Sequence, residues 1–347
     1  MKSLVEELCS KDCAGRKPGT TGGLRARSLV RDALRSAGTD PIEQAIGSTK
    51  GANLVATLPG DVDRWVLVAA HYDHLGASPS GDRFFPGADD NAAAVAILVE
   101  VARGLAAKRA DGRGVIIAAF DAEESPYFLT DAMGSQCFAR NAASLGTPLD
   151  TIDLMVCMDL VGHALGPEGL PESVRSSLLA LGAERSMGTS AMVDDLARAT
   201  EGVIVRRVDA EVIPPLSDYD AFWKSEVPFL FLTSGRSQRY HTPEDTPEHL
   251  DWKKMTATSR WLEALVRRAC ARPEDRVRFD AGARDDASTL RTFDDLVAPL
   301  AAISPMAADG QRTARELLAQ CDARGRLPNA LADAPRALVA ALESGLA

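Results

Sequence analysis

The sequence of 347 residues lacks any apolar run that approaches the roughly 18 residues needed to cross a membrane. Residues 1–8 (MKSLVEEL) also lack a hydrophobic core, because acidic side chains stand where a secretory signal would be apolar. We therefore expect a cytoplasmic protein with no membrane partner.

Positive charge is scarce: 39 Lys and Arg residues are outnumbered by 49 Asp and Glu residues, for a formal net charge of −10. Such a chain is repelled by the phosphates of nucleic acids and by anionic lipid surfaces. We expect no nucleic-acid partner, whereas assembly into a homo-oligomer stays open.

Cysteine is also rare, with six residues scattered along the chain. Only Cys9 and Cys13 lie close together, and neither a second pair nor a nearby histidine completes a metal site with them. In a chain without a secretory signal we expect reduced thiols. The fold must then depend on a hydrophobic core, which a chain of this length can bury without disulfides.

Short apolar strands alternate with helices over the first three quarters of the chain. The pattern predicts strands at residues 52–58, 65–70, 114–120, 152–158, 203–208 and 227–232. It predicts helices at residues 20–37, 92–107, 136–145, 173–181, 191–200 and 252–271. This alternation is typical of an α/β fold in which helices sandwich a mixed, mostly parallel central sheet.

The character of the sequence changes near residue 273. A charged segment leads into Ala-, Leu- and Arg-rich stretches that predict helices at about 288–303, 309–323 and 331–345, without any strand pattern. We expect an α/β domain over residues 1–272 and an all-helical extension over residues 273–347.

Several predicted strands end in side chains that can bind a metal, or lead to one within a loop. If these strands are parallel, their carboxyl ends meet at one edge of the sheet. The candidate ligands are His71, Asp90, Glu124, Asp159 and His241. Two histidines, two aspartates and a glutamate form a mixed nitrogen and oxygen set that suits zinc, with cobalt or manganese as alternatives.

Each candidate alone also has an ordinary structural explanation. Asp89-Asp90-Asn91 at the start of a helix is more often a cap than a ligand, and Asp159 after an apolar strand is often a turn residue. Only their joint arrival at one sheet edge predicts a metal site.

The motifs that carry a family resemblance are, in chain order, His71-Tyr-Asp73, Gly87-Ala-Asp-Asp90-Asn, Glu123-Glu124, Asp159 and Tyr240-His241-Thr-Pro-Glu-Asp. Together they resemble the co-catalytic zinc aminopeptidase family, which also contains glutamate carboxypeptidase II and glutaminyl cyclase. The resemblance covers about residues 14–265 and implies that residues 1–272 form a zinc peptidase catalytic domain.

The resemblance implies two zinc ions per chain. Asp90 bridges them, His71 and Asp159 complete the first position, and Glu124 and His241 complete the second. The peptide bond after the bridging aspartate is expected to be cis.

Three more residues take roles from the resemblance. Glu123 is the general base: it takes a proton from a water held between the ions and passes it to the leaving amine. Asp73 orients His71, and Tyr240 can donate a hydrogen bond to the developing oxyanion. The implied activity is that of an aminopeptidase, which removes N-terminal residues from peptides with a free N-terminus.

Two alternative functions stay open. Asp159-Leu-Val-Gly resembles the corresponding segment of glutaminyl cyclases, which use a single zinc ion, although they usually carry Trp where Tyr240 stands. A metal-free binding protein on a retired peptidase scaffold is the alternative from another class, but it would normally have lost ligands.

The sequence departs from the family pattern at two places. Residues 125–135 form a longer loop than is common there, with Tyr127 and Phe128 as candidate pocket walls. Tyr219 stands where family members often have His, after Ser217-Asp218, which we expect to cap a short helix. His74 and His163 match no family role but lie near ligands in the sequence.

Overall fold

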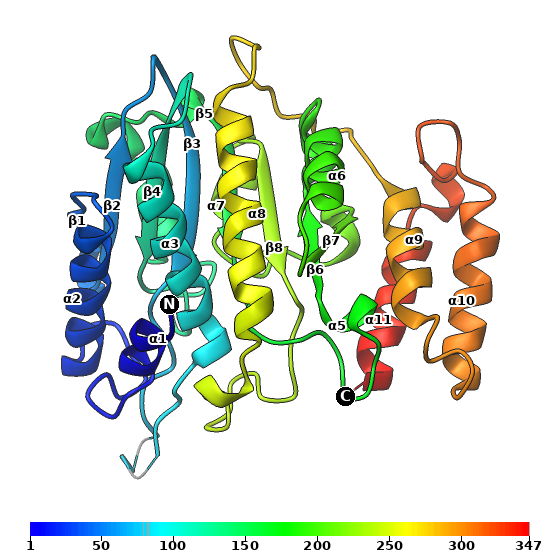
Figure 1. The fold of residues 1–347 in the computed structure, drawn as a ribbon, viewed down its shortest axis with the longest axis horizontal. Coiled ribbons are helices and arrows are strands. Elements are labelled where there is room, and N and C mark those ends of the chain that lie inside the picture. Colours follow the sequence, from blue (N-terminus) through cyan, green and yellow to red (C-terminus); the bar gives the residue numbers. More distant parts are fainter. Residues whose placement is uncertain (79, 82, 347) are drawn as a thin grey trace.

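One sheet of eight strands runs through the computed structural model, which describes residues 1–78, 80–81 and 83–346, and helices cover both of its faces (Figure 1). The strands lie in the order β1-β2-β4-β3-β5-β8-β6-β7. Their bounds are β1 Ile42–Ala45, β2 Ala52–Leu58, β3 Val62–His71, β4 Arg113–Phe120, β5 Ile152–Met158, β6 Ser177–Leu181, β7 Ile204–Val208 and β8 Phe229–Thr233.

The helices alternate with these strands and then follow them. Their bounds are α1 Lys2–Leu8, α2 Thr21–Ser36, α3 Ala93–Ala107, α4 Gly134–Asn141, α5 Glu172–Arg175, α6 Thr189–Ala199, α7 Asp220–Lys224, α8 Trp252–Cys270, α9 Asp286–Val297, α10 Pro305–Leu318 and α11 Ala334–Leu346. Within the described ranges, none of these helices is both long and apolar enough to span a membrane.

The sheet is mixed and mostly parallel, as the sequence predicts. Strands β4, β3, β5 and β8 are neighbours and run parallel, and so does the β6–β7 pair. Antiparallel pairing joins β1 to β2, β2 to β4, and β6 to β8. The four central parallel strands therefore share one carboxyl edge.

Alternating residues of the central strands build two apolar layers. Val66 and Val68 of β3 face the layer that α1, α2, α3, α6 and α8 cover, whereas Leu67 and Ala69 face the layer of α4 and α7. Because both faces of the sheet are buried, the sequences of these strands are continuous apolar runs and do not alternate between apolar and polar residues.

The helix predicted at residues 173–181 is wrong. A single turn, α5, ends at Arg175, and Ser177–Leu181 then forms β6 between β8 and β7. Leu and Ala favour a helix locally. Pairing on both sides and burial in the sheet override that preference.

The C-terminal helices α9–α11 form a small core of their own around Leu290, Phe293 and Leu317. They join the sheet at its β7 edge, where the Asp209 amide donates to Thr289 Oγ1 (2.9 Å) and Thr292 Oγ1 donates to the Arg207 carbonyl (3.0 Å). We propose that this separate core marks a helical extension to the α/β domain, with the boundary near residue 272.

A buried ion pair fastens the segment between the two parts. Asp153 pairs with Arg113 (2.5 Å) and Arg64 and accepts the Val277 amide (3.0 Å), while Arg113 also donates to the Arg272 carbonyl (2.8 Å). Both Arg113 and Asp153 are almost fully buried. Removal of Asp153 would therefore leave the Arg113 charge buried without an ion-pair partner.

We expect Asp153→Ala to lower the free energy of unfolding by about 3–5 kcal/mol, because it leaves the Arg113 charge buried without a counter-ion. Urea unfolding followed by circular dichroism measures this. Glu6→Ala, which breaks the exposed Lys2–Glu6 pair, is the control and should change stability little. Equal effects of the two substitutions would contradict the structural role of Asp153.

Candidate metal centre

The shared carboxyl edge of β4, β3, β5 and β8 collects the ligand candidates. His71 is the last residue of β3, Asp159 follows β5 directly, and Glu124 lies four residues beyond β4. His241 comes from the loop after β8, and Asp90 from the turn that leads into α3. Because the four strands are parallel neighbours, five residues distant in sequence meet at one place.

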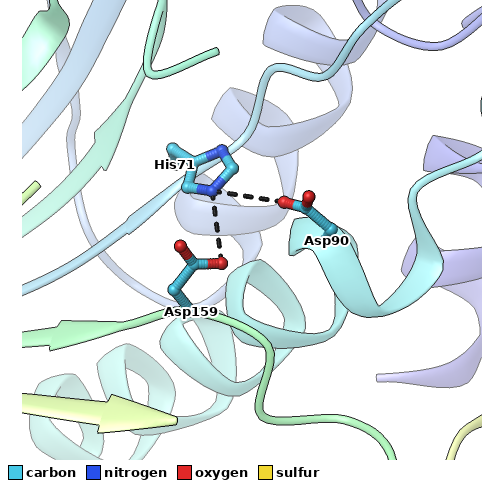
Figure 2. Close-up of side chains that lie close together, drawn as sticks. All are labelled: His71, Asp90 and Asp159. Carbon is cyan, nitrogen blue, oxygen red and sulfur yellow. Dashed lines mark ion pairs between the residues drawn. The ribbon is translucent and has the colours of Figure 1, made fainter. Parts of the chain in front are cut away.

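His71, Asp90 and Asp159 form the first ligand group (Figure 2). The Nε2 atom of His71 lies 3.5 Å from Asp90 Oδ1 and 3.5 Å from Asp159 Oδ1. All three residues are buried, with Asp159 the most exposed of them at 7 %. The two carboxylates converge on the same ring nitrogen from the turn before α3 and from the end of β5.

His241, Glu124 and again Asp90 form the second ligand group. The Nε2 atom of His241 lies 3.1 Å from Asp90 Oδ2 and 3.3 Å from Glu124 Oε1. Asp90 therefore directs one carboxylate oxygen to each group, which is the geometry that a shared ligand requires.

The spacing of these atoms fits metal coordination. Tetrahedral zinc with bonds of about 2.0–2.1 Å places neighbouring ligand atoms about 3.3 Å apart, and the four separations given above range from 3.1 to 3.5 Å. Among the described residues, three of these buried atoms have no hydrogen-bond partner: His71 Nε2, Asp159 Oδ1 and His241 Nε2. Buried polar atoms are rarely left unpaired, so their convergence fits a cation between them.

The electrostatics of the cluster also fit a bound cation. Burial and the neighbouring Glu124 charge raise the pKa of Asp90 well above its usual range. Burial, with Asp159 and Glu124 nearby, does the same to the pKa of Glu123 against the opposing effect of His71. Burial opposes ionisation of Glu124 too, but hydrogen bonds from His241 and His74 lower its pKa. The site holds more carboxylates than positive charge, a deficit that divalent cations would fill.

Glu123 lies beside the first ligand group rather than within it. Its Oε2 atom is 3.9 Å from His71 Nε2, farther than either ligand carboxylate. Asp73 holds this segment, since its two oxygens accept the amides of Glu123 (3.0 Å) and Glu124 (3.1 Å). Asp73 Oδ1 is also 3.6 Å from His71 Nδ1, so the orienting role that the resemblance implies stays a prediction.

Tyr240 lies on the rim of the site. Its ring stacks on that of His241 at 3.8 Å, and the guanidinium of Arg236 lies 4.8 Å from the Tyr240 ring centre. Burial and the charges of Asp90 and Glu124 raise the pKa of Tyr240. The phenol therefore stays protonated at neutral pH and can serve as a hydrogen-bond donor.

The Asp90–Asn91 peptide is cis, as the resemblance implies. Asp245 supports the turn around it: its carboxylate accepts the amides of Asp89 (2.9 Å) and Asp90 (3.1 Å). Asp245 stands four residues after His241, so one loop supplies a ligand candidate and holds the turn of another. Asp245 belongs to the motif Tyr240-His241-Thr-Pro-Glu-Asp, but its supporting role was not predicted from the sequence.

Asp89 has a supporting function that explains why Asp90 is the ligand candidate of the pair. Its Oδ1 atom accepts the amides of Gly162 (2.7 Å) and His163 (3.0 Å), and its Oδ2 atom is 2.7 Å from His163 Nδ1. These bonds tie the turn before α3 to the loop after β5. His163 thus contacts the residue next to the ligand candidate Asp90.

Two buried residues near the ligands were not predicted as site residues. His74 Nδ1 is 2.8 Å from Glu124 Oε1, and His74, Asp90 and Glu124 also lie close enough to hold a metal. Asp218 is fully buried, and burial together with Asp73 raises its pKa to about 7, against the effect of His71. Their signals were the second histidine of His71-x-x-His74 and the Ser217-Asp218 pair.

Asp218 does not cap a helix, contrary to the sequence-based expectation. α7 begins at Asp220 with Tyr219 as its N-cap, and in the described part of the chain neither Asp218 oxygen has a hydrogen-bond partner. Tyr219 is buried and stacks on Phe231 at a centroid distance of 4.5 Å, so its ring fills the apolar layer below the sheet edge. Tyr127 packs against Ile46, Ala122 and Cys137.

The chain has the fold of zinc exopeptidases, and its ligand candidates gather at the carboxyl edge of the parallel strands. Residues 53–266, more than half of the chain, match the model of Peptidase family M28, and the chain belongs to that family. The family and the site together support a zinc-dependent hydrolase of the peptidase type.

Three similar proteins illustrate the range of the relatives. The uncharacterized protein YfbL of Escherichia coli is 29% identical over 252 residues, which cover 67% of this chain and 76% of YfbL. The glutaminyl-peptide cyclotransferase of Bos taurus is 25% identical over 282 residues, or 72% of this chain and 77% of that protein. The crystal structure of the Legionella pneumophila LapA aminopeptidase has a TM-score of 0.64 at 17% identity, covering 79% of this chain and 73% of that one, and it shares the fold.

We expect Asp245→Ala to weaken zinc binding and to destabilise the metal-free protein. Two buried amides, those of Asp89 and Asp90, lose their acceptors, and each costs about 1–3 kcal/mol when left unpaired. Competition with a chromogenic chelator measures zinc affinity, and urea unfolding measures stability. The exposed neighbour offers the control Glu244→Ala, which should leave both unchanged. Unchanged zinc affinity in Asp245→Ala would refute the supporting role.

Proposed function

We propose that this chain is a zinc-dependent aminopeptidase that binds two zinc ions and removes N-terminal residues from peptides. The observation that carries the proposal is the division of Asp90 between two ligand groups, one with His71 and Asp159 and one with Glu124 and His241. A shared carboxylate is the arrangement that a two-metal hydrolase uses.

Zinc at these positions supplies Lewis acidity, which makes water a better nucleophile and polarises a carbonyl group. The side chains of the chain supply the proton transfers. Glu123 is a buried carboxylate next to the ligands whose pKa is already raised, and such a group can accept a proton from water and return it to the amine that leaves. Asp73 keeps its backbone in place through the Glu123 amide.

Two further features fit a peptide with a free N-terminus. A free terminal amine is a nitrogen donor of the kind that zinc binds, whereas an acylated nitrogen is not, so a free N-terminus is favoured over a blocked one. Tyr240 stands beside His241 with a protonated phenol, which can donate a hydrogen bond to a carbonyl oxygen as negative charge develops there.

Glutaminyl-peptide cyclisation is the second candidate. The likeness to the bovine cyclotransferase, which extends over 72% of this chain, favours it. Tyr240 in place of the usual cyclase Trp and a second ligand group around Asp90 favour the peptidase. A cytoplasmic location stays a prediction from the sequence.

A substrate panel separates the two candidates. Aminoacyl anilides and short peptides should be hydrolysed with zinc or cobalt present, N-acetylated versions should resist, and a glutaminyl peptide should lose its first residue rather than cyclise. Mass spectrometry identifies the products. Cyclised product without hydrolysis would replace the proposal with the cyclase alternative, and rapid cleavage of blocked peptides would exclude an aminopeptidase.

The adjacent glutamates offer a matched pair of variants. We expect Glu123→Gln to keep both zinc ions and to lose about 100-fold or more in kcat, because a carboxamide cannot take the proton. Glu124→Gln should instead lose one zinc ion. Elemental analysis of dialysed protein gives the zinc content alongside the kinetics. Full turnover by Glu123→Gln would remove it as the general base.

A further inference from the structure

His74 is a fully buried histidine whose only side-chain hydrogen bond among the described residues is to Glu124 (Nδ1 to Oε1, 2.8 Å). A carboxylate only accepts, so the ring donates from Nδ1. The other ring nitrogen, Nε2, has no hydrogen-bond partner in the described ranges. The ring therefore makes no polar contact that would give it a separate structural role.

The distances distinguish a supporting residue from a ligand. His241 Nε2 is 3.3 Å from Glu124 Oε1, the separation of two ligands on one tetrahedral zinc ion. His74 Nδ1 lies 2.8 Å from the same oxygen, which is a hydrogen-bond distance, and 3.8 Å from Asp90 Oδ2, farther than the 3.1 Å between His241 Nε2 and that oxygen.

The fold keeps this histidine in place. It lies three residues after His71, on the loop beyond β3, and its ring packs against Gly87, where a Cβ atom would come within 2.6 Å of His74 Cδ2. Asp73, the residue before it, fixes Glu124 from the backbone side by accepting its amide (3.1 Å). The Glu124 backbone and carboxylate are thus held by adjacent residues of one loop.

We propose that His74 is a positioning residue for the second metal position: its hydrogen bond fixes the Glu124 carboxylate and thereby sets the zinc affinity of the Glu124–His241 position selectively. Hydrogen bonds to a ligand from residues behind it typically change metal affinity by about 10–100-fold. The inference rests on the proposed zinc site but not on aminopeptidase activity.

The test measures zinc binding to the full chain. Metal-free wild type, His74→Ala and His74→Asn are titrated with Zn²⁺ against a chromogenic chelator. His74→Ala should bind one ion as wild type does and the other about 10–100-fold more weakly, and His74→Asn, which retains an N–H donor, should recover part of the loss. His249→Ala, a substitution of an exposed histidine, is the control.

Two backgrounds identify the affected position. Asp159→Asn disables the first position, so adding His74→Ala there should weaken the single remaining ion about 10–100-fold. Glu124→Gln disables the second position, and His74→Ala should then change nothing. The thermal unfolding temperature of each metal-free variant reports whether the fold is intact. If His74→Ala fails to fold, His74→Leu, which fills the space without a hydrogen-bond donor, is compared with His74→Asn instead.

Wild-type zinc affinity at both positions in His74→Ala would overturn the inference. Equal losses of zinc affinity in the Asp159→Asn and Glu124→Gln backgrounds would also overturn it, because they would mean a general effect on the fold. A zinc-bound crystal structure with His74 Nδ1 at bonding distance from the ion would make it a ligand and overturn the positioning role. Absence of zinc binding by the wild type would instead refute the proposed metal site itself.

Discussion

Buried negative charge at one sheet edge is the constraint on which the rest of this structure depends. Asp90, Glu123, Glu124 and Asp159 are each at most 7 % exposed, and placing such groups out of water is unfavourable unless something compensates. The raised pKa values of Asp90 and Glu123 reflect how unfavourable the buried ionised carboxylates are. A metal-free chain would have to keep some of these carboxylates protonated, whereas a metal-bound chain would not.

Two buried cations around the site, Arg16 and Lys254, bind backbone and hydroxyl oxygens rather than the site carboxylates. Arg16 is fully buried and donates to five carbonyl groups, among them those of Tyr72, Gly87 and Asp90. Lys254 donates to the His163 carbonyl and to Ser234 Oγ. In the described ranges neither cation forms an ion pair with a site carboxylate. Arg16 and Lys254 hold loops together without neutralising the site carboxylates, whose negative charge therefore favours binding of a cation.

The ligand candidates could be predicted because several strand patterns end in a residue that can bind a metal, or lead to one within a loop. Once β3 and β5 are recognised as apolar runs, His71 and Asp159 follow at their ends, and parallel pairing brings them together. Residues 177–181 show where local preference fails, since a Leu- and Ala-rich segment becomes a strand only because β7 and β8 lie on either side. Such pairing is a property of the whole sheet, and no short window of sequence contains it.

The supporting residues were harder to predict for a different reason. Asp245, His74 and Arg16 act through hydrogen bonds to particular backbone or carboxylate atoms, and these partners become known only when the loops are placed. Asp89 and Asp90 are adjacent carboxylates at a helix start, yet one binds amides and the other faces the two histidines. The sequence alone cannot separate them without the family resemblance.

The fold alone does not separate peptide hydrolysis from cyclisation. In both reactions a carbonyl is attacked and a nitrogen group leaves, so both need a carboxylate that can accept a proton and return it, which is the position of Glu123. They differ in whether water or the substrate's own amine reaches the carbonyl. Either nucleophile would meet the carbonyl at the two ligand groups around Asp90, beside rim side chains such as Tyr240. The residues around Asp90 and Glu124, rather than the sheet below them, therefore determine the chemistry.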